Sequence, residues 1–571
     1  MRTLLSAVAV ILSIGAAQGQ GGAKKGVTCP VDLDDVKALG AAQAAINIQP
    51  THAFLPATAP DPATGFVLEV DGVRLRFDPR WVAQLDTEVS RLTSLGVHVI
   101  AIVTCAIPPG ADNRHPLVHE RCDVVRAPNH LTAFRVNDAA GTAHFTGFLR
   151  FCASRFPGIA GYVIGNEIDA HWQWHNLGEA SAGDVIAQHA RELVLACRAL
   201  HGVRPALRVF TSLTHSWALP HALSPRRALA ARRLLRALLV HDELRALRWD
   251  VAYHPYPENL FEPRFWTDRT AFLAQDTPKV TLKNLEVLLD ELARDGRGRR
   301  VILSEQGFHR QDGDDGDDVQ AAAYALAWRR VEAMAGVDAF LLHRHVDHKN
   351  EGGLRLGLWS CDPASADPCK PFAKRRMHEV FRAAGTPAFE DVARFALPIV
   401  GLGSWDEVVV HEGPVPAHAR EWHPWHRDGE GLDLLDALDG AGLDDARLDD
   451  ALAFEHRFVT TTDGILPGVM LHPKTTRAPG RANVALRAAT KPGQLRFAVA
   501  KLGEGGDGVR FAVELDGREL WSSVTESALP QRFTVAIPAS SSARTLSFVV
   551  HARGDCAWDH ACWLAPRLVD G

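Results

Sequence analysis

Two short apolar runs in the sequence each end in a glutamate. One reads Tyr162-Val163-Ile164-Gly165-Asn166-Glu167, and the other reads Val301-Ile302-Leu303-Ser304-Glu305. Near-continuous apolar runs of this length are typical of strands in a parallel sheet that is buried on both faces. When such a sheet closes into a barrel, the carboxyl ends of its strands converge, so both glutamates are expected at one mouth.

Further stretches between residues 27 and 393 share this pattern and alternate with amphipathic segments. The apolar runs lie at residues 45–48, 98–104, 162–165, 207–211, 251–254, 301–304 and 339–343, after a weaker run near residues 27–29. The amphipathic segments lie at residues 80–95, 183–200, 225–244, 279–294, 319–335 and 373–384. Eight strands alternating with helices predict an α/β fold, a (β/α)8 TIM barrel. A doubly wound sheet is the alternative, but no glycine-rich phosphate loop follows the first strands.

The rest of the chain has a different character. Residues 394–454 are rich in Asp, Gly, Ala and Leu, which predicts an extension packed on the barrel or a linker. From residue 455 to residue 571 the apolar period becomes two, as at residues 495–501, 509–515, 532–537 and 545–551. Short β-rich runs separated by Gly, Pro and Ser predict an antiparallel, jelly-roll-like β-sandwich.

The first 19 residues have the composition of a secretory signal. Arg2 precedes an apolar core at residues 4–14, and Ala17 and Gly19 have the spacing of a cleavage site. The core is too short to span a bilayer, and no later segment reaches 18 uncharged apolar residues. The protein is therefore expected to be secreted or periplasmic, with no membrane partner. The oligomeric state stays open.

Composition narrows the class of partner. The 571 residues carry 62 Lys and Arg against 68 Asp and Glu, a net charge of −6, so no overall positive charge favours nucleic acid. The 14 tryptophans are more unusual, because indole rings stack well on apolar faces, including those of sugars. Core packing is the alternative explanation for most of them.

The nine cysteines are expected to be partly paired in an exported protein. Two of the expected pairs close short loops, and a third flanks a barrel loop. In that order they are Cys361–Cys369, Cys556–Cys562 and Cys105–Cys122. Cys152 and Cys197 lie on predicted helices, where a buried free thiol is expected.

A pair of carboxyl groups at one mouth suits glycoside hydrolysis. One group protonates the leaving oxygen, and the other attacks the anomeric carbon. Each glutamate alone is better explained as a solvated strand end or an ion pair. Together, Glu167 and Glu305 favour chemistry, with a retaining mechanism and no need of a metal or cofactor.

The Asn166-Glu167 and Glu305 positions resemble those of clan A retaining β-glycosidases. The resemblance implies that Glu167 is the general acid/base, Glu305 the nucleophile and Asn166 a ligand of the sugar 2-hydroxyl. It extends to His254 and Tyr256 in the string Tyr253-His254-Pro255-Tyr256-Pro257, which would line the site. The second strand departs from the clan, because Asn47 stands where many members have an arginine. Asn47 is expected to take part of that role, and the alternative is a site that is tuned differently.

A narrower resemblance is to a bacterial family of barrel proteins of unknown function, placed near clan A. It rests on the strings at residues 165–167, 253–257, 302–308 and 342–348, and it covers about residues 27–411. It implies that His343 and Arg344 border the sugar site. The alternative, a metal site at His343, His345 and His348, is disfavoured.

Aromatic side chains near the two glutamates favour a sugar substrate. Trp172 and Trp174 follow Glu167, while Trp217 and Trp359 follow the fifth and eighth strands. Loop packing is the alternative, and at most half of them are expected to contact sugar.

The C-terminal string at residues 555–568 resembles a family of jelly-roll carbohydrate-binding modules, over about residues 455–571. The alternative is a structural sandwich docked on the barrel, with Trp558 and Trp563 in its core.

The sequence thus predicts a secreted retaining glycoside hydrolase that cleaves β-linkages in a poly- or oligosaccharide. The alternatives are a catalytically silent glycan-binding protein and a transglycosylase that uses the same covalent intermediate.

Overall fold

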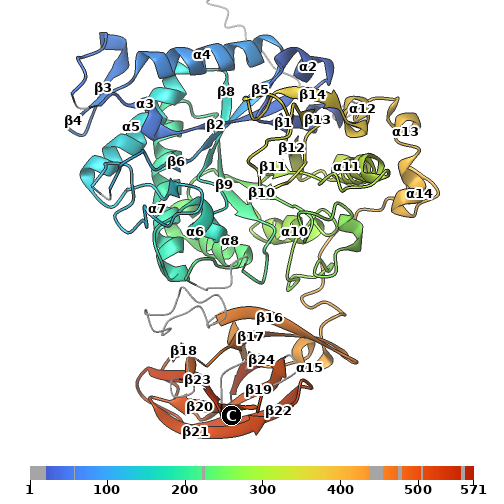
Figure 1. Ribbon diagram of the computed structural model, residues 1–571. Coiled ribbons are helices and arrows are strands. Elements are labelled where there is room, and N and C mark those ends of the chain that lie inside the picture. Colours follow the sequence, from blue (N-terminus) through green and yellow to red (C-terminus); the bar gives the residue numbers. More distant parts are fainter. Residues whose placement is uncertain are drawn as a thin grey trace, which may run out of the picture.

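A computed structural model places a parallel barrel and a separate β-rich domain in one chain (Figure 1). The structure describes residues 21–56, 58–112, 114–220, 226–435, 454–473, 479–502, 506–554 and 560–570. The expected signal at residues 1–19 lies outside them. Among the described residues, no helix has both the length and the apolar character needed to cross a bilayer.

Eight parallel strands close the barrel in the order β1-β12-β11-β10-β9-β8-β5-β2, which confirms the predicted TIM barrel. They are β1 Lys25–Thr28, β2 Gln43–Ile48, β5 His98–Val103, β8 Ile159–Ile164, β9 Arg208–Thr214, β10 Asp250–His254, β11 Val301–Gln306 and β12 Val337–Leu342. The short strands β3 Val67–Val70, β4 Val73–Arg76, β6 Cys105–Ala106, β7 Leu131–Thr132, β13 Trp359–Cys361 and β14 Pro371–Lys374 pair as three hairpin-like sheets outside it.

Helices cover the outside of the barrel (Figure 1). The longer ones are α4 Pro79–Ser94, α5 Ala139–Arg155, α7 Ala182–Val203, α8 Ala231–Val240, α10 Glu286–Arg294, α11 Gly316–Ala333 and α12 Arg376–Ala383. The shorter ones are α1 Gly21–Lys24, α2 Leu33–Ala38, α3 Pro50–Ala53, α6 His171–Trp174, α9 Asp242–Arg245, α13 Phe389–Val392, α14 Ala396–Val400 and α15 Pro424–Arg427.

The barrel interior is a packed apolar layer. Its members come from seven strands and include Ala45, Val163, Phe210, Ala252 and Ile302. Because side chains alternate along a strand, residues two further on from these point towards the mouth. This places Asn47, Ser212, His254 and Ser304 on the inner face at the carboxyl end.

The C-terminal domain is an antiparallel β-sandwich, as predicted. One sheet has the order β16-β17-β24-β19-β22, with β15 pairing β24, and the other has the order β18-β23-β20-β21. The strands are β15 Leu432–Asp433, β16 Phe454–Thr461, β17 Gly464–Leu471, β18 Gly480–Leu486, β19 Gly493–Leu502, β20 Val509–Leu515, β21 Arg518–Thr525, β22 Gln531–Ile537, β23 Arg544–Ala552 and β24 His560–Asp570.

The sandwich core centres on Trp563. Its ring centroid lies 5.2 Å from that of Phe497, 5.1 Å from Phe511 and 5.0 Å from Phe548, and the side chain is fully buried. Trp563 therefore packs the two sheets together and is not available to a glycan. Trp558 lies outside the described residues.

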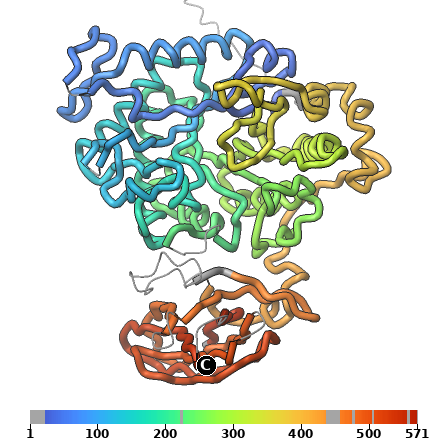
Figure 2. The backbone as a smooth tube through the Cα atoms, viewed as in Figure 1, coloured from blue at the N-terminus to red at the C-terminus, as the bar shows by residue number. Residues whose placement is uncertain are grey.

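The chain passes from barrel to sandwich through residues 394–435, drawn in orange in Figure 2. Trp405 and Val415 pack into the barrel's apolar cluster. Further on, Trp422 packs with Phe272 of the barrel and Ile465 of the sandwich, so one indole joins the two domains.

The described cysteines correct the predicted disulfides. Cys361 and Cys369 are free thiols, and so is Cys105, so neither the Cys361–Cys369 nor the Cys105–Cys122 bridge is present. Cys105 Sγ instead faces the carbonyl of Leu117 at 3.5 Å. Cys152 and Cys197 are buried free thiols, as predicted. Cys556 lies outside the described residues.

Candidate active site

Glu167 lies just beyond β8, where the chain turns sharply. Gly165 has φ +74°, and Glu167 itself has the left-handed values φ 42° and ψ 57°. A Cβ on residue 165 would lie 2.5 Å from Ile168 and 3.1 Å from His175, so only glycine fits. The backbone N–H of Glu167 donates to Ser212 Oγ on β9 at 2.9 Å. The left-handed turn thus holds the glutamate at the mouth.

Glu305 reaches the same mouth because β11 carries a bulge. Leu303 pairs with Phe340 and Gln306 with Leu342, so β11 has one residue more than β12 between these pairs. Ile302 and Ser304 face the interior, and strict alternation would turn Glu305 towards the helices. The extra residue turns the Glu305 side chain towards the mouth, as bulges beside active sites commonly do.

His254 and Tyr256, from the end of β10, connect to the two glutamates. His254 Nδ1 lies 2.9 Å from Glu167 Oε1, and His254 Nε2 lies 3.0 Å from Ser304 Oγ. The hydroxyl of Tyr256 donates to Glu305 Oε1 at 3.0 Å. One side-chain atom from each of Glu167, His254 and Glu305 lies within 4.8 Å of the others.

The surroundings favour an ionised Glu305. Burial alone would raise the pKa of Glu305, but His343, His254 and the Tyr256 hydroxyl outweigh it, and its pKa lies below the usual value. Burial likewise disfavours charge on His254, yet the carboxylates of Glu305 and Glu167 raise its pKa. The imidazole groups of His343 and His254 thus stabilise the negative charge of Glu305.

A third carboxylate, Glu351, lies near the mouth and was not predicted. Its Oε1 lies 2.6 Å from His343 Nε2 and accepts from Arg344 Nη1 at 3.3 Å. His343 Nδ1 lies 2.8 Å from Thr28 Oγ1, so both ring nitrogens of His343 have protein partners. Within the described chain, Glu351 Oε2 and Arg344 Nε are buried without a partner. No local sequence pattern marks Glu351, which follows the eighth strand in an irregular loop.

Asn166 and Asn47 border the same mouth. Asn166 directly precedes Glu167 and is 8% exposed. Asn47 lies on the inward face of β2 and is exposed. Their roles in binding sugar stay predictions.

The four predicted tryptophans are not alike. Trp217 is fully buried and its indole N–H donates to the carbonyl of Gln275, so its prediction as a sugar contact is wrong. Trp172 is largely buried, with the guanidinium of Arg227 4.3 Å from its ring centroid. Trp359 donates from Nε1 to Asp35 at 2.8 Å, and Trp174 is half-buried on α6.

A second cluster lies behind the site and is fully buried. Glu192 of α7 accepts bonds at its two oxygens from His175, His189, Gln188 and the backbone N–H of Phe134, over distances of 2.8–3.1 Å. His189 Nε2 lies 2.8 Å from Thr211 Oγ1 on β9. Since His175 also backs on Gly165, the network holds the loop that carries Glu167.

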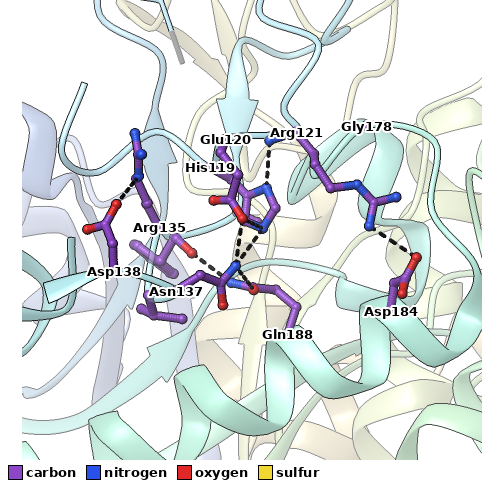
Figure 3. Close-up of polar contacts among 12 residues, drawn as sticks. His119, Glu120, Arg121, Arg135, Asn137, Asp138, Gly178, Asp184 and Gln188 are labelled. Carbon is purple, nitrogen blue, oxygen red and sulfur yellow. Dashed lines mark hydrogen bonds and ion pairs between the residues drawn. The ribbon is translucent and has the colours of Figure 1, made fainter. Parts of the chain in front are cut away.

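Polar contacts continue outward from this cluster (Figure 3). Gln188 donates to the carbonyl of Phe134 and accepts a hydrogen bond from the Asn137 amide at 3.2 Å. The Asn137 amide also donates to Glu120 at 2.8 Å. His175, His189 and Glu192 have the residue types of a metal site. Their direct hydrogen bonds already satisfy the carboxylate, so hydrogen bonding accounts for the cluster.

Some solved structures resemble the fold at very low identity. They include a family 39 glycoside hydrolase from Bacteroides cellulosilyticus WH2 (12% identity, 92% of this chain and 81% of that one, TM-score 0.40). A β-glucosidase from Pyrococcus furiosus has 16% identity over 64% of this chain and 86% of its own, with a TM-score of 0.41. A glucosidase from Croceicoccus marinus has 13% identity, with coverage of 94% and 97% and a TM-score of 0.41.

The comparison with sequence families assigns the chain to one of them. No curated protein sequence matches the chain. The model of a family of unknown function, DUF5722, matches residues 17–408, more than half of the chain. The protein therefore belongs to the DUF5722 family.

Proposed function

We propose that the protein is a glycoside hydrolase that cleaves β-linkages in a poly- or oligosaccharide with retention of anomeric configuration. The observation that carries this proposal is the approach of Glu167 and Glu305 at the barrel mouth, where one carboxyl oxygen of each lies no more than 4.8 Å from one of the other. Retaining enzymes hold their two carboxyl groups about 5–5.5 Å apart, whereas inverting enzymes leave about 6.5–9.5 Å for a water. The separation here supports direct attack by a carboxylate.

Each glutamate has one role in the reaction. The Glu305 carboxylate attacks the anomeric carbon while Glu167 gives its proton to the departing glycosidic oxygen, so the C–O bond breaks as the ester forms. Glu167, now ionised, takes a proton from water, which attacks the same carbon and releases Glu305. The lowered pKa of Glu305 suits the first step, because only the carboxylate is a nucleophile.

His254 gives Glu167 a partner in both of its protonation states. An imidazole that carries a proton on Nδ1, neutral or charged, donates to Glu167 Oε1, whether or not the other Glu167 oxygen carries the acid proton. When the ester at Glu305 forms, one negative charge that favours the imidazolium disappears. The proton for the leaving oxygen then comes from the Glu167 oxygen that does not contact His254.

The test is a panel of β-linked polysaccharides and aryl β-glycosides, with Glu305→Gln and Glu167→Gln as matched variants. We expect turnover that each variant lowers by orders of magnitude at unchanged melting temperature. Proton NMR of the first product should give the retained anomer. Inverted product, or normal turnover by Glu305→Gln, contradicts the proposal. Binding without turnover identifies a silent glycan-binding protein, and transfer to sugar acceptors identifies a transglycosylase.

Export and glycan binding by the sandwich belong to the same proposal. The first 19 residues support export, which N-terminal sequencing of the mature protein tests. For the sandwich, the resemblance at residues 555–568 is the support, and Trp563 cannot supply the contact because it is buried. Affinity electrophoresis of the chain in soluble polysaccharide gels, with a variant lacking residues 455–571, tests this binding.

A further inference from the structure

A cavity of about 470 Å³ opens at the face of the barrel opposite the glutamates. It lies at the amino-terminal ends of β9, β10 and β11, whereas Glu167 and Glu305 lie at the carboxyl ends. Six of its fourteen lining residues are arginines and one is an acid, Asp250. The arginines are Arg208, Arg245, Arg248, Arg297, Arg299 and Arg300.

Three carboxylates neutralise half of this positive charge. Asp250 and Asp338 pair with Arg208 at 2.7 and 2.8 Å, and Asp338 also pairs with Arg300. Asp295 pairs with Arg299 at 2.9 Å and more distantly, at 3.5 Å, with Arg297. Six guanidinium groups against three carboxylates leave an excess of three positive charges around one cavity.

Two of the arginines have no carboxylate partner at all within the described chain. Arg245 and Arg248 are exposed, and the one hydrogen bond of the Arg248 side chain among the described residues goes to the carbonyl of Pro205. Arginine at the end of a helix compensates the helix dipole, which explains Arg245 at the end of α9. It does not explain Arg248, or the run Arg297-Gly298-Arg299-Arg300, which precedes a strand.

Arg299 points most directly to a ligand. Its side chain is 3% exposed, and its guanidinium lies 3.8 Å from the ring centroid of Trp249. Nε donates to Asp295 and Nη1 donates to the carbonyl of Trp249, but Nη2 is buried and has no acceptor among the described residues. Buried charged donors without acceptors are rare, and a native one calls for an unseen ligand, ion or water.

We propose that this cavity binds an oxyanion with at least two negative charges, a phosphate or sulfate group. Guanidinium groups match the oxygens of such groups with paired hydrogen bonds, and several converge here on one space. The excess of three positive charges fits a divalent anion better than a carboxylate. Gly298, with φ +66° and open space around its missing Cβ, leaves the rim unobstructed.

The ligand is independent of the glycosidic site. A cavity of this size holds more than an inorganic ion, so the group has two possible sources: free phosphate or sulfate, and an ester on a saccharide. Bound on the face opposite the mouth, such an ester would anchor the protein to an acidic glycan without occupying the catalytic carboxylates.

Isothermal titration of the full chain tests the proposal without any turnover. The probes are sodium sulfate, sodium phosphate and a sulfated disaccharide, with sodium chloride at equal ionic strength and the unsulfated disaccharide as references. We expect saturable binding of the divalent anions and none of chloride. Tighter binding of the sulfated disaccharide than of sulfate identifies an ester as the ligand, and equal binding identifies the free ion.

Three variants localise the site. Arg248→Gln is exposed and should fold normally, Arg299→Gln removes the buried charge, and Arg382→Gln on α12 is an exposed control outside the cavity. We expect Arg248→Gln and Arg299→Gln to weaken binding roughly tenfold or more and Arg382→Gln to leave it unchanged. Absence of binding, or equal affinity of Arg248→Gln and the parent, overturns the proposal. Since no hydrolysis is measured, that result leaves the glycosidase proposal untouched.

Discussion

The hydroxyl of Tyr256 donates a hydrogen bond to Glu305 Oε1 at 3.0 Å, in a site where burial works against the Glu305 charge. Tyr256 is 7% exposed, and the pKa of its phenol is raised by burial and by Glu305, so it stays a donor at ordinary pH. The proposed nucleophile therefore keeps its charge through neighbours that can be removed one at a time.

Replacing Tyr256 by Phe should lower kcat/KM roughly 10- to 100-fold, the value of one hydrogen bond to a charged group. The pH profile should move as well. Glu305 must be ionised to attack, so activity falls as the pH drops through its pKa. Loss of the Tyr256 donor raises that pKa and moves the acidic limb to higher pH. An unshifted acidic limb contradicts this role.

Asp169 makes stability depend on pH. It is fully buried, with Oδ1 accepting from the Thr214 N–H at 2.9 Å and Oδ2 from the Thr214 hydroxyl, and burial raises its pKa to about 7. A carboxyl with a raised folded-state pKa stabilises the protein below its unfolded pKa, about 3.9, and loses that contribution as the pH rises through about 7.

We therefore expect the free energy of unfolding to fall between pH 5 and pH 8 by an amount on the order of a few kcal/mol from Asp169. Asp169→Asn keeps the acceptor for the Thr214 N–H but cannot ionise, so its unfolding free energy should change less over this range. Urea unfolding of both proteins at each pH measures the difference. Parallel curves for the two proteins would show that Asp169 does not titrate there.

Removing the buried charge of Glu192 should destabilise the loop that carries Glu167. Glu192→Ala leaves His175, His189 and the Phe134 N–H without their acceptor, a loss on the order of 3–5 kcal/mol. Glu192→Gln keeps one acceptor oxygen and should lose less. Thermal unfolding measures both, and the exposed Glu390→Gln serves as control. Equal melting temperatures for all three variants contradict a structural role.

Much of the barrel could be predicted because its strands are buried on both faces. Runs such as residues 301–303 are then apolar without interruption, and each predicted run overlaps an observed strand. The helix α5 at Ala139–Arg155 was missed, since it buries residues on several sides and has no clear amphipathic period. The helix expected from residue 373 begins at Arg376, because Pro371–Lys374 pairs with β13 instead.

The site was less predictable than the fold. A position at or just after the end of a strand is enough to place Glu167 and His254 at the mouth. The direction of the Glu305 side chain depends on a bulge, which only the register of β11 with β12 reveals. Trp217 follows a strand as Glu167 does, yet its N–H and ring lie in the core. Glu351 lies in an irregular loop, where sequence pattern gives no direction.

The cysteines of the barrel should react as free thiols. Cys361 and Cys369 are half-buried and unpaired, and burial raises the pKa of the Cys369 thiol. Iodoacetamide in denaturant without reductant should alkylate both, and Cys152 and Cys197 as well. Peptide mass spectrometry reads each site, with a reduced sample as control. A Cys361–Cys369 peptide that appears only after reduction would restore the disulfide expected for an exported protein.

Glu351 should contribute to substrate binding through Oε2. Its Oε1 contacts His343 and Arg344, while Oε2, like Arg344 Nε, is buried without a partner in the described chain. A sugar hydroxyl can donate a hydrogen bond to Glu351 Oε2 and accept one from Arg344 Nε, which gives both atoms a partner. Glu351→Gln should then lower kcat/KM roughly tenfold or more, because the hydrogen bond to a charged acceptor becomes a bond to a neutral one.

A series of monodeoxy aryl glycosides locates the contact that Glu351 makes. The substrate that lacks the contacted hydroxyl should react equally with Glu351→Gln and the parent. If every deoxy substrate shows the same ratio as the full sugar, Glu351 acts only by holding His343 in place.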